Sequence, residues 1–245
     1  MLTILSLLPK IRGVFSLSAA AALLACAWTA VLGQSATSAE RRSHVIGLLE
    51  KPLSDPPPNG STDLAVVVRD ILFNARTYGG IVAVNTENCT DHKISYRRTK
   101  GETSFKGALD AVVAAAPKYR WTLSDEGAIN VLPAGSLPEF LNTDIPYFDW
   151  DVNKPMYTAL AYLNDTHEVR KRRLELNITQ VGFGGLYALR EGDGLEKPGD
   201  WRRVEHVSLL STLNTIAESY GNGVWVYSEC RRADSITIQL TDLVR

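Results

Sequence analysis

The chain has 245 residues, of which 45% are hydrophobic and 22% are charged, a balance that is typical of a folded globular protein and excludes a chain that is disordered throughout. Its 26 basic and 27 acidic residues leave a formal net charge of −1, which excludes the strongly basic character of many nucleic-acid-binding proteins. We therefore expect a protein with a buried core and no nucleic-acid partner.

The N-terminal segment has the pattern of an export signal. Residues 13–33 form an apolar run that follows two basic residues and precedes a stretch of small residues. This order is typical of an export signal, with cleavage after Ala36 or Ala39. The sequence therefore predicts an export signal over residues 1–39 and a mature chain that works in the periplasm or outside the cell. Without this signal, 24 basic and 27 acidic residues remain, for a net charge of −3.

The same segment admits two alternatives to a cleaved signal. The apolar run is long enough, at roughly 20 residues, to span a bilayer as an uncleaved anchor. Residues 23–26 also resemble a lipoprotein cleavage box, which would make Cys26 a lipidated first residue. Either alternative would attach the protein to a membrane through its N-terminus.

The next part of the chain predicts a linker followed by an α+β unit. Residues 40–60 hold a candidate strand at 45–49 and a linker whose three consecutive prolines exclude a helix. Residues 61–133 form the first unit. The elements expected in it are a helix over 64–75, capped by Ser61 or Thr62 and stopped by Gly79 and Gly80, a strand over 81–84, a polar loop over 85–92, a strand over 93–98, a helix over 105–116 capped by Thr103 or Ser104, and a hairpin of strands 119–123 and 128–132.

Residues 140–242 predict a second α+β unit with the same order. The elements expected in it are a strand over 145–150, a helix over 153–163, a strand over 174–178, a helix over 209–220, a strand that contains Trp225, and a final strand over 235–240. The interval between Leu109 and Leu213 equals that between Trp121 and Trp225. A constant offset indicates two copies of one unit, although a helix followed by a hairpin is also a common local motif.

The predicted fold class is therefore α+β, with two small helix-on-sheet units that form a degenerate tandem repeat. In each unit, the helices are expected to cover one face of a small, mostly antiparallel sheet. The hairpin tryptophan is expected to pack on the preceding helix, Trp121 against Leu109 and Trp225 against Leu213. An insertion over residues 190–203 has no counterpart in the first unit, and it either carries function or is only tolerated.

The first unit contains the segments DLAVVVRDILFNARTYGGIVAVN and KISYRRTKGETSFKGALDAVVAAAPKYRWTLSDEGAINVLP. Its helix carries Ala108, Leu109 and Asp110, and strands 119–123 and 127–131 follow. This pattern resembles the short N-terminal domain shared by secretins and TonB-dependent receptors (STN-like), over residues 61–133 and less closely over 140–240. The resemblance implies a role in docking a periplasmic protein or in sensing its state.

The cysteines allow a disulfide between the two units. Once Cys26 leaves with the signal, Cys89 and Cys230 are the only pair, in a compartment where disulfides persist. They either form a bridge or remain unrelated thiols.

No sequence motif points to catalysis or to a metal. The four histidines, at positions 44, 92, 167 and 206, do not stand at metal-ligand spacing, and neither HExxH nor CxxC occurs. We therefore expect no catalytic residue, no metal and no cofactor. The alternative is an exported enzyme in which Cys89 and His92 act in a cleft between the two units.

Three further segments have both a functional and a structural interpretation. Tyr147, Phe148 and Trp150 alternate with acidic residues, as in sugar-binding or partner-binding surfaces, but a strand with one buried face gives the same pattern. Residues 170–173 are basic and form either an anion site or a solvated face. The glycines at 182–185 suggest a phosphate loop or, with no lysine at the required spacing, a bend in a strand.

These observations predict an exported, non-enzymatic protein-interaction or envelope-associated module. Its partner would be an envelope or periplasmic protein, received along an exposed sheet edge. The alternatives are the exported enzyme and a small-ligand or glycan-binding protein that uses a cleft between the two units.

Overall fold

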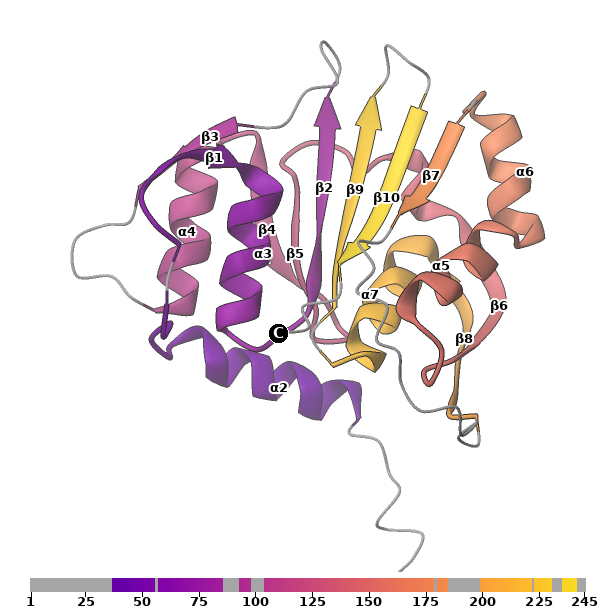
Figure 1. Cartoon of the computed structure of the whole chain (residues 1–245), viewed down its shortest axis with the longest axis horizontal. Coiled ribbons are helices and arrows are strands. Elements are labelled where there is room, and N and C mark those ends of the chain that lie inside the picture. The colour runs from indigo at the N-terminus through magenta and orange to yellow at the C-terminus, as the bar shows by residue number, and fades with distance from the viewer. Residues whose placement is uncertain are drawn as a thin grey trace, which may run out of the picture. The chain divides into compact units, whose positions relative to one another are not determined.

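The computed structural model describes residues 37–55, 57–85, 93–97, 104–178, 180–184, 199–221, 223–230 and 235–241, which form an α+β fold (Figure 1). The elements in chain order are α2 (Ser38–Leu49), β1 (Gly60–Asp63), α3 (Leu64–Asn74), β2 (Gly79–Asn85), β3 (Lys93–Tyr96), α4 (Phe105–Ala115), β4 (Tyr119–Leu123), β5 (Ile129–Pro133), the 3-10 helix η1 (Glu139–Asn142), β6 (Asp144–Asp151), α5 (Met156–Asn164), α6 (His167–Glu175), β7 (Gln180–Gly184), β8 (Trp201–Ser208), α7 (Leu209–Ser219), β9 (Val224–Cys230) and β10 (Ser235–Thr241).

We call the part of the chain with strands β1 to β5 the first half and the part with strands β6 to β10 the second half. A six-stranded sheet includes strands of both halves, in the order β4-β5-β2-β9-β10-β7. Figure 1 shows β2, β9, β10 and β7 side by side. The pairs β2–β5, β2–β9 and β7–β10 are parallel, whereas β4–β5 and β9–β10 are antiparallel. Two antiparallel pairs, β1–β3 and β6–β8, form separate two-stranded sheets. The expectation of two small, mostly antiparallel sheets is therefore wrong, because the parallel pairing of β2 with β9 joins the halves into one mixed sheet.

The two halves share one order of elements and one set of pairings. In each half the first strand pairs antiparallel with the third, as β1 does with β3 and β6 with β8. The second strand pairs parallel with the last, as β2 does with β5 and β7 with β10. A helix precedes each hairpin, α4 before β4–β5 and α7 before β9–β10. Two copies of one unit would have this order, with α6 as an addition in the second.

The central sheet is covered by helices on both faces. One core cluster combines Ile81 and Val131 with residues of α2, α3 and α4. The other combines Val82 and Leu132 with residues of α5, α6 and α7. Neighbouring residues of a strand point to opposite faces, so these clusters lie on opposite sides of the sheet. Strand β4 is antiparallel to β5 and therefore also to β2. Strand β9, which begins the hairpin of the second half as β4 begins that of the first, is parallel to β2. The second half is therefore turned over relative to the first. The helices of each half lie on one face, as expected for each unit, and both faces of the sheet are covered because the two halves share it.

Both hairpin tryptophans contact the preceding helix, as predicted. Trp121 packs against the cluster that contains Leu109, and its indole N–H donates to Asp110 of α4 at 2.8 Å. Trp225 lies in the same cluster as Leu213, and its indole N–H donates to Asn214 of α7 at 2.9 Å.

Three expectations for the first half need correction. Residues 45–49 are not a strand but the end of helix α2. The cap of α3 is Asp63, the residue directly before the helix, whose Oδ1 accepts from the N–H of Ala65 at 2.8 Å. Residues 61 and 62 lie further upstream in strand β1. The helix α3 ends at Asn74 and the chain reverses at Arg76, which has a φ of 53°.

Gly79 and Gly80 are strand residues and not the stop of the preceding helix. They begin β2, and neither position has room for a side chain. A Cβ on Gly79 would lie 1.8 Å from the carbonyl oxygen of Ile129, and one on Gly80 would lie 1.9 Å from the indole of Trp225. Close approach of neighbouring strands therefore explains this pair of glycines.

The strand predicted over 174–178 is also wrong, because helix α6 continues to Glu175. The apolar alternation suggested a half-buried strand, yet Leu174 is 80% exposed. Ion pairs one helical turn apart, Lys171 with Glu175 at 3.8 Å and Arg172 with Glu175 at 2.8 Å, fit the helix instead.

Several predictions fall partly or wholly outside the described residues. These are the export signal up to residue 36, the loop with Cys89 and His92, and residues 190–198 of the insertion. The remainder of the predicted insertion includes residues 201–203, which begin strand β8. Within the described ranges, no helix combines the length and the apolar character needed to cross a bilayer.

Candidate binding groove between α5 and strands β6 and β8

The predicted aromatic surface on β6 is divided between the core and the solvent. Phe148 and Trp150 are only 4% and 1% exposed, and their rings stack with centroids 5.5 Å apart. The indole N–H of Trp150 donates to the hydroxyl of Ser219 at 3.1 Å. The prediction of a surface made of all three aromatic residues is therefore wrong, and the alternative, a strand with one buried face, describes this pair.

Tyr147 is 48% exposed, but its polar and aromatic groups already have partners. Its hydroxyl donates to Asp149 at 2.7 Å, and this hydrogen bond raises the pKa of Tyr147. The guanidinium carbon of Arg203 lies 4.8 Å from the ring centroid. Tyr147 is therefore a weaker candidate for ligand contact than its exposure alone suggests.

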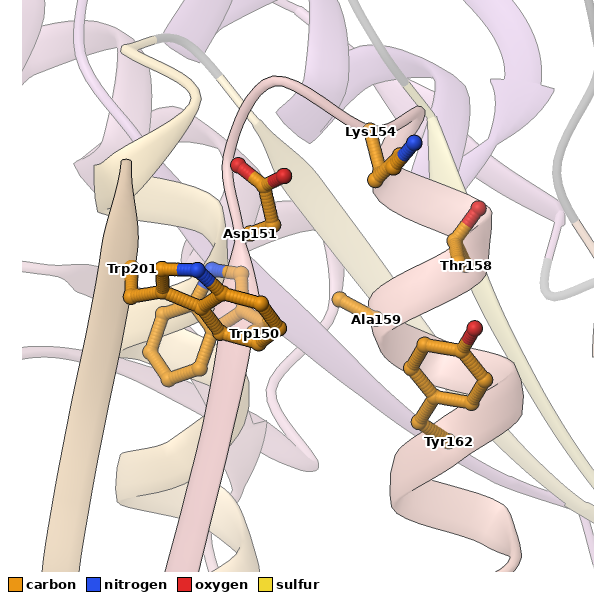
Figure 2. Close-up of a pocket in the computed structure, with 7 residues that line it drawn as sticks. All are labelled: Trp150, Asp151, Lys154, Thr158, Ala159, Tyr162 and Trp201. Atoms are coloured by element: carbon orange, nitrogen blue, oxygen red, sulfur yellow. The ribbon is translucent and has the colours of Figure 1, made fainter. Parts of the chain in front are cut away.

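A small groove opens beside the same strand, between α5 and the β6–β8 pair (Figure 2). Its cavity volume is about 80 Å³, and it is lined by Trp150, Asp151, Lys154, Thr158, Ala159, Tyr162 and Trp201. Figure 2 shows the two tryptophans on the strand side and Thr158 and Tyr162 on the helix side. Trp201 is 64% exposed and Tyr162 is 60% exposed. The groove thus has exposed aromatic rings on both sides.

Helical periodicity places the residues of the helix side. Thr158 and Tyr162 stand four residues apart, which puts them along one side of α5, and Lys154 lies in the turn just before the helix. The opposite side of the helix, with Leu160 and Leu163, is buried in the core. The amphipathic character of α5 therefore turns this polar and aromatic side toward the groove.

Strand pairing places the residues of the strand side. Asp151, the last residue of β6, is the register partner of Trp201, the first residue of β8. Gly199 leaves room for the indole, since a Cβ there would lie 2.5 Å from Nε1 of Trp201.

The loop that follows β6 is held by hydrogen bonds. Oδ1 of Asp151 accepts from the N–H groups of Asn153 at 3.0 Å and Asp200 at 3.1 Å. The N–H of Val152 donates to the carbonyl of Asp200 at 3.0 Å. Tyr220 donates to the carbonyl of Lys154 at 2.9 Å. The rim of the groove is therefore already formed without a ligand, as is usual for binding sites.

Several polar groups of the groove have no hydrogen-bond or ion-pair partner in the described part of the chain. They are Oδ2 of Asp151, Nζ of Lys154, Oγ1 of Thr158, the hydroxyl of Tyr162 and Nε1 of Trp201. The indole N–H groups of the other described tryptophans are all bonded within the protein. The groove thus offers aromatic faces together with donors and acceptors that a ligand can use.

Of the residues that line this groove, only Trp150 was among the candidate site residues predicted from the sequence. The stripe at 154, 158 and 162 was a detectable signal, because it places polar and aromatic residues along one side of a predicted helix. Trp201 lay inside the predicted insertion. Its position beside Asp151 follows from a strand pairing between residues far apart in the sequence.

The other candidate sites have structural roles where they are described. The basic residues 170–173 lie in α6, where Arg170 pairs with Asp165 at 3.2 Å and Arg172 pairs with Glu139 and Glu175. Gly182 and Gly184 are regular strand residues of β7, paired with β10. These contacts favour the structural interpretation of both segments.

Cys230 ends strand β9, and its register partner on β2 is Asn85. Cys89 and His92 lie outside the described residues, so the proposed bridge and the Cys89–His92 cluster both stay predictions. Among the residues that the structure does describe, no group of three or more His, Cys, Asp or Glu side chains could hold a metal ion.

Comparison with protein-family models, with curated proteins and with solved structures finds no match to this chain.

Proposed function

We propose that this protein is an exported, non-enzymatic binding module that holds a component of the cell envelope in the groove between α5 and β6–β8. The observation that carries the proposal is the combination in that groove of two exposed aromatic rings, on Tyr162 and Trp201, with polar groups that have no protein partner in the described chain. A mostly apolar recess with a few polar groups is typical of a binding site.

The chemistry of the lining residues supports binding over catalysis. Asp151 commits one carboxylate oxygen to two backbone N–H groups, which is a positioning role. Thr158 has no hydrogen bond from its hydroxyl to a base among the described residues, as an activated nucleophile would need. The remaining groups can contact a ligand without reacting with it.

The element order supports the resemblance to the short N-terminal domain of secretins and TonB-dependent receptors. The first half runs through α3, β2, β3, α4 and the β4–β5 hairpin, the order expected for that domain. We propose the same for the second half, where β7, β8, α7 and β9–β10 correspond. An envelope component as partner fits this resemblance.

Export over residues 1–39 is part of the proposal. Helix α2 begins at Ser38, so cleavage after Ala36 would leave the helix whole, whereas cleavage after Ala39 would remove its first two residues. N-terminal sequencing of the protein recovered from cells distinguishes these sites. An N-terminus at Met1 or a lipidated Cys26 would contradict soluble export.

Affinity capture from an envelope extract tests the binding role. The wild-type protein is expected to retain a component that Trp201→Ala retains at least tenfold less. Tyr147→Ala is the matched control, because it removes an exposed aromatic ring from β6 that does not line the groove. Equal capture by wild type and Trp201→Ala, or no capture under conditions that recover known envelope complexes, would contradict the proposal.

A protein partner added along strand β4 is the second candidate. This strand is an edge of the central sheet. The N–H of Ser124 donates to the carbonyl of Ala128, and the N–H of Ala134 donates to the carbonyl of Lys118. In an antiparallel pair, residues alternate between pointing their backbone N–H and C=O toward the partner strand and away from it. The backbone groups of Trp121 and Leu123 therefore point away from β5. An added strand would use those groups.

Leu123→Pro tests this second candidate, because it removes an N–H that only a docked strand would use. Thr122→Pro, which removes an N–H directed at β5, is the destabilising comparison. Unchanged partner capture by a folded Leu123→Pro protein would exclude strand addition at β4.

A further inference from the structure

We propose that the groove between α5 and β6–β8 binds one pyranose ring of a glycan. This inference rests on the proposed function and names its ligand class. It depends on the arrangement of Trp201 and Tyr162 and on the polar groups that line the same groove.

The aromatic rings suit the apolar face of a sugar. Trp201 and Tyr162 are more than half exposed and stand on opposite sides of the groove (Figure 2). The face of an aromatic ring carries partial negative charge, which attracts the polarised C–H groups of a sugar ring. The buried Trp150 and Ala159 contribute further apolar surface. A pyranose ring can thus be held on its apolar face and at its edges.

The polar groups suit hydroxyls better than a single charge. Asp151 provides an acceptor in Oδ2, Lys154 and Trp201 provide donors, and the hydroxyls of Thr158 and Tyr162 can do either. Sugar hydroxyls need this mixture because each donates and accepts.

The charges of the groove argue against an anionic ligand. Among the described residues that line the groove, Lys154 is the one cationic side chain and Asp151 is the one anionic side chain. Recognition of phosphate or carboxylate usually relies on clustered or bidentate cations. The two opposite charges therefore favour a neutral polar ligand.

The size of the groove limits the ligand to one ring at a time. Its volume is about 80 Å³, whereas sites for drug-sized molecules have roughly 300–1,000 Å³. A single sugar unit would be partly enclosed and its neighbours would lie in solvent. We expect a dissociation constant on the order of 1 mM for a short oligosaccharide.

A peptide fits the groove less well than a sugar does. An extended peptide gains much of its affinity from backbone hydrogen bonds to a strand or loop. The N–H groups of Val152, Asn153 and Asp200 at the rim already donate within the protein. A peptide would therefore have few main-chain partners there.

Titration of the isolated mature protein with cellopentaose, maltopentaose and chitotetraose tests the proposal. The readout is the indole N–H resonance of Trp201 in a nitrogen-correlated NMR spectrum, assigned by its loss in Trp201→Ala. At least one oligosaccharide is expected to shift this resonance with saturation. The indole resonances of Trp121 and Trp225, bonded inside the protein, should move little.

Three variants separate the loss of a ligand contact from a change of fold. Ligand binding to each variant is measured from the resonances other than that of Trp201. Trp201→Ala is expected to weaken binding at least tenfold, and Thr158→Val, which keeps the side-chain shape but removes the hydroxyl, about fivefold. Tyr147→Ala should bind within twofold of wild type. Loss of affinity in Tyr147→Ala equal to that in Trp201→Ala would overturn the assignment to the groove.

The outcomes distinguish this inference from the proposed function. If no oligosaccharide shifts the Trp201 resonance at a concentration 20-fold above the expected dissociation constant, the proposal that the groove binds a sugar is wrong. The proposed function then still stands if envelope capture depends on Trp201, with a protein or peptide as the ligand. If neither measurement depends on Trp201, both are wrong.

Discussion

The two halves of the molecule use one contact in two environments. In the first half, the indole N–H of Trp121 donates to Asp110, and in the second half that of Trp225 donates to Asn214. The partners are 11 residues apart in both cases, and the bonds are 2.8 and 2.9 Å long. The difference is burial: Trp121 lies half-buried on the edge strand β4, whereas Trp225 is fully buried on β9 inside the sheet.

The acceptor follows the environment of the tryptophan. The Asp110 side chain is 45% exposed and pairs with Lys106 at 2.7 Å. Partial burial raises the pKa of Asp110, but hydrogen bonds from Lys106 and Trp121 outweigh this effect and the pKa is lowered overall. Asn214 is only 1% exposed. A carboxylate there would lose its hydration, so a neutral amide is the better acceptor in the buried copy.

The largest predicted effect concerns a covalent link between the halves. Asn85 is the register partner of Cys230, and Cys89 follows Asn85 by four residues, a distance along the chain that can span up to about 14 Å. A Cys89–Cys230 disulfide, one of the two alternatives that the sequence leaves open, would close a loop of about 140 residues and contribute on the order of 4–5 kcal/mol from loop-closure entropy. Thiol counting in denatured, unreduced protein checks it, and two reactive thiols per mature chain would exclude the bridge.

Gly80→Ala should break the buried copy of the contact. Its Cβ would lie 1.9 Å from the indole of Trp225, which the bond to Asn214 and the full burial hold in place. We expect a loss of about 3 kcal/mol or more in the free energy of unfolding, measured by urea denaturation.

Gly47→Ala in helix α2 is the control for the glycine substitution, because nothing lies within 4 Å of its added Cβ. It should stabilise the protein by about 0.5–1 kcal/mol. A similar loss of stability for both variants would show that the close packing of Trp225 on Gly80 is not the cause.

Asn214→Asp exchanges the acceptor of the buried copy for that of the exposed copy. We expect a loss of about 2 kcal/mol at pH 7, because the carboxylate is buried. Burial raises the folded-state pKa of such a carboxyl above its unfolded value, so stability should recover as the pH falls toward 5. Urea denaturation at pH 7 and pH 5 measures this recovery, and equal losses at both pH values would contradict the explanation.

Asp110→Asn makes the reverse exchange. It should change the free energy of unfolding least, by less than about 1 kcal/mol, because the side chain of Asp110 is 45% exposed. The lowered pKa of Asp110 means that its contribution is present at neutral pH and is lost as the pH falls below the ordinary value of 3.8. The variant should therefore lose part of the acid dependence of the urea midpoint. A larger loss of stability at pH 7 than that of Asn214→Asp would reverse the proposed role of burial.

Features that depend on neighbouring residues were predictable from the sequence. Helices α4 and α7 follow from apolar residues at helical spacing, and Ser104 caps α4 as one of the two residues expected. The hairpin β4–β5 follows from alternation around a short turn. The contact of each hairpin tryptophan with its helix also followed, since helix and strand are consecutive elements.

The sequence by itself thus determined the α+β class and most of the helices and strands, because periodicity, capping and turns act over a few residues. Tertiary structure decided the rest. The pairing of β2 with β9 turned the second half over and buried Trp225, and the pairing of β6 with β8 brought Trp201 to Asp151, beside Tyr162. These strand pairings depend on hydrogen bonds and packing between residues 50 or more positions apart. A pattern that spans only a few residues of the sequence cannot predict such contacts.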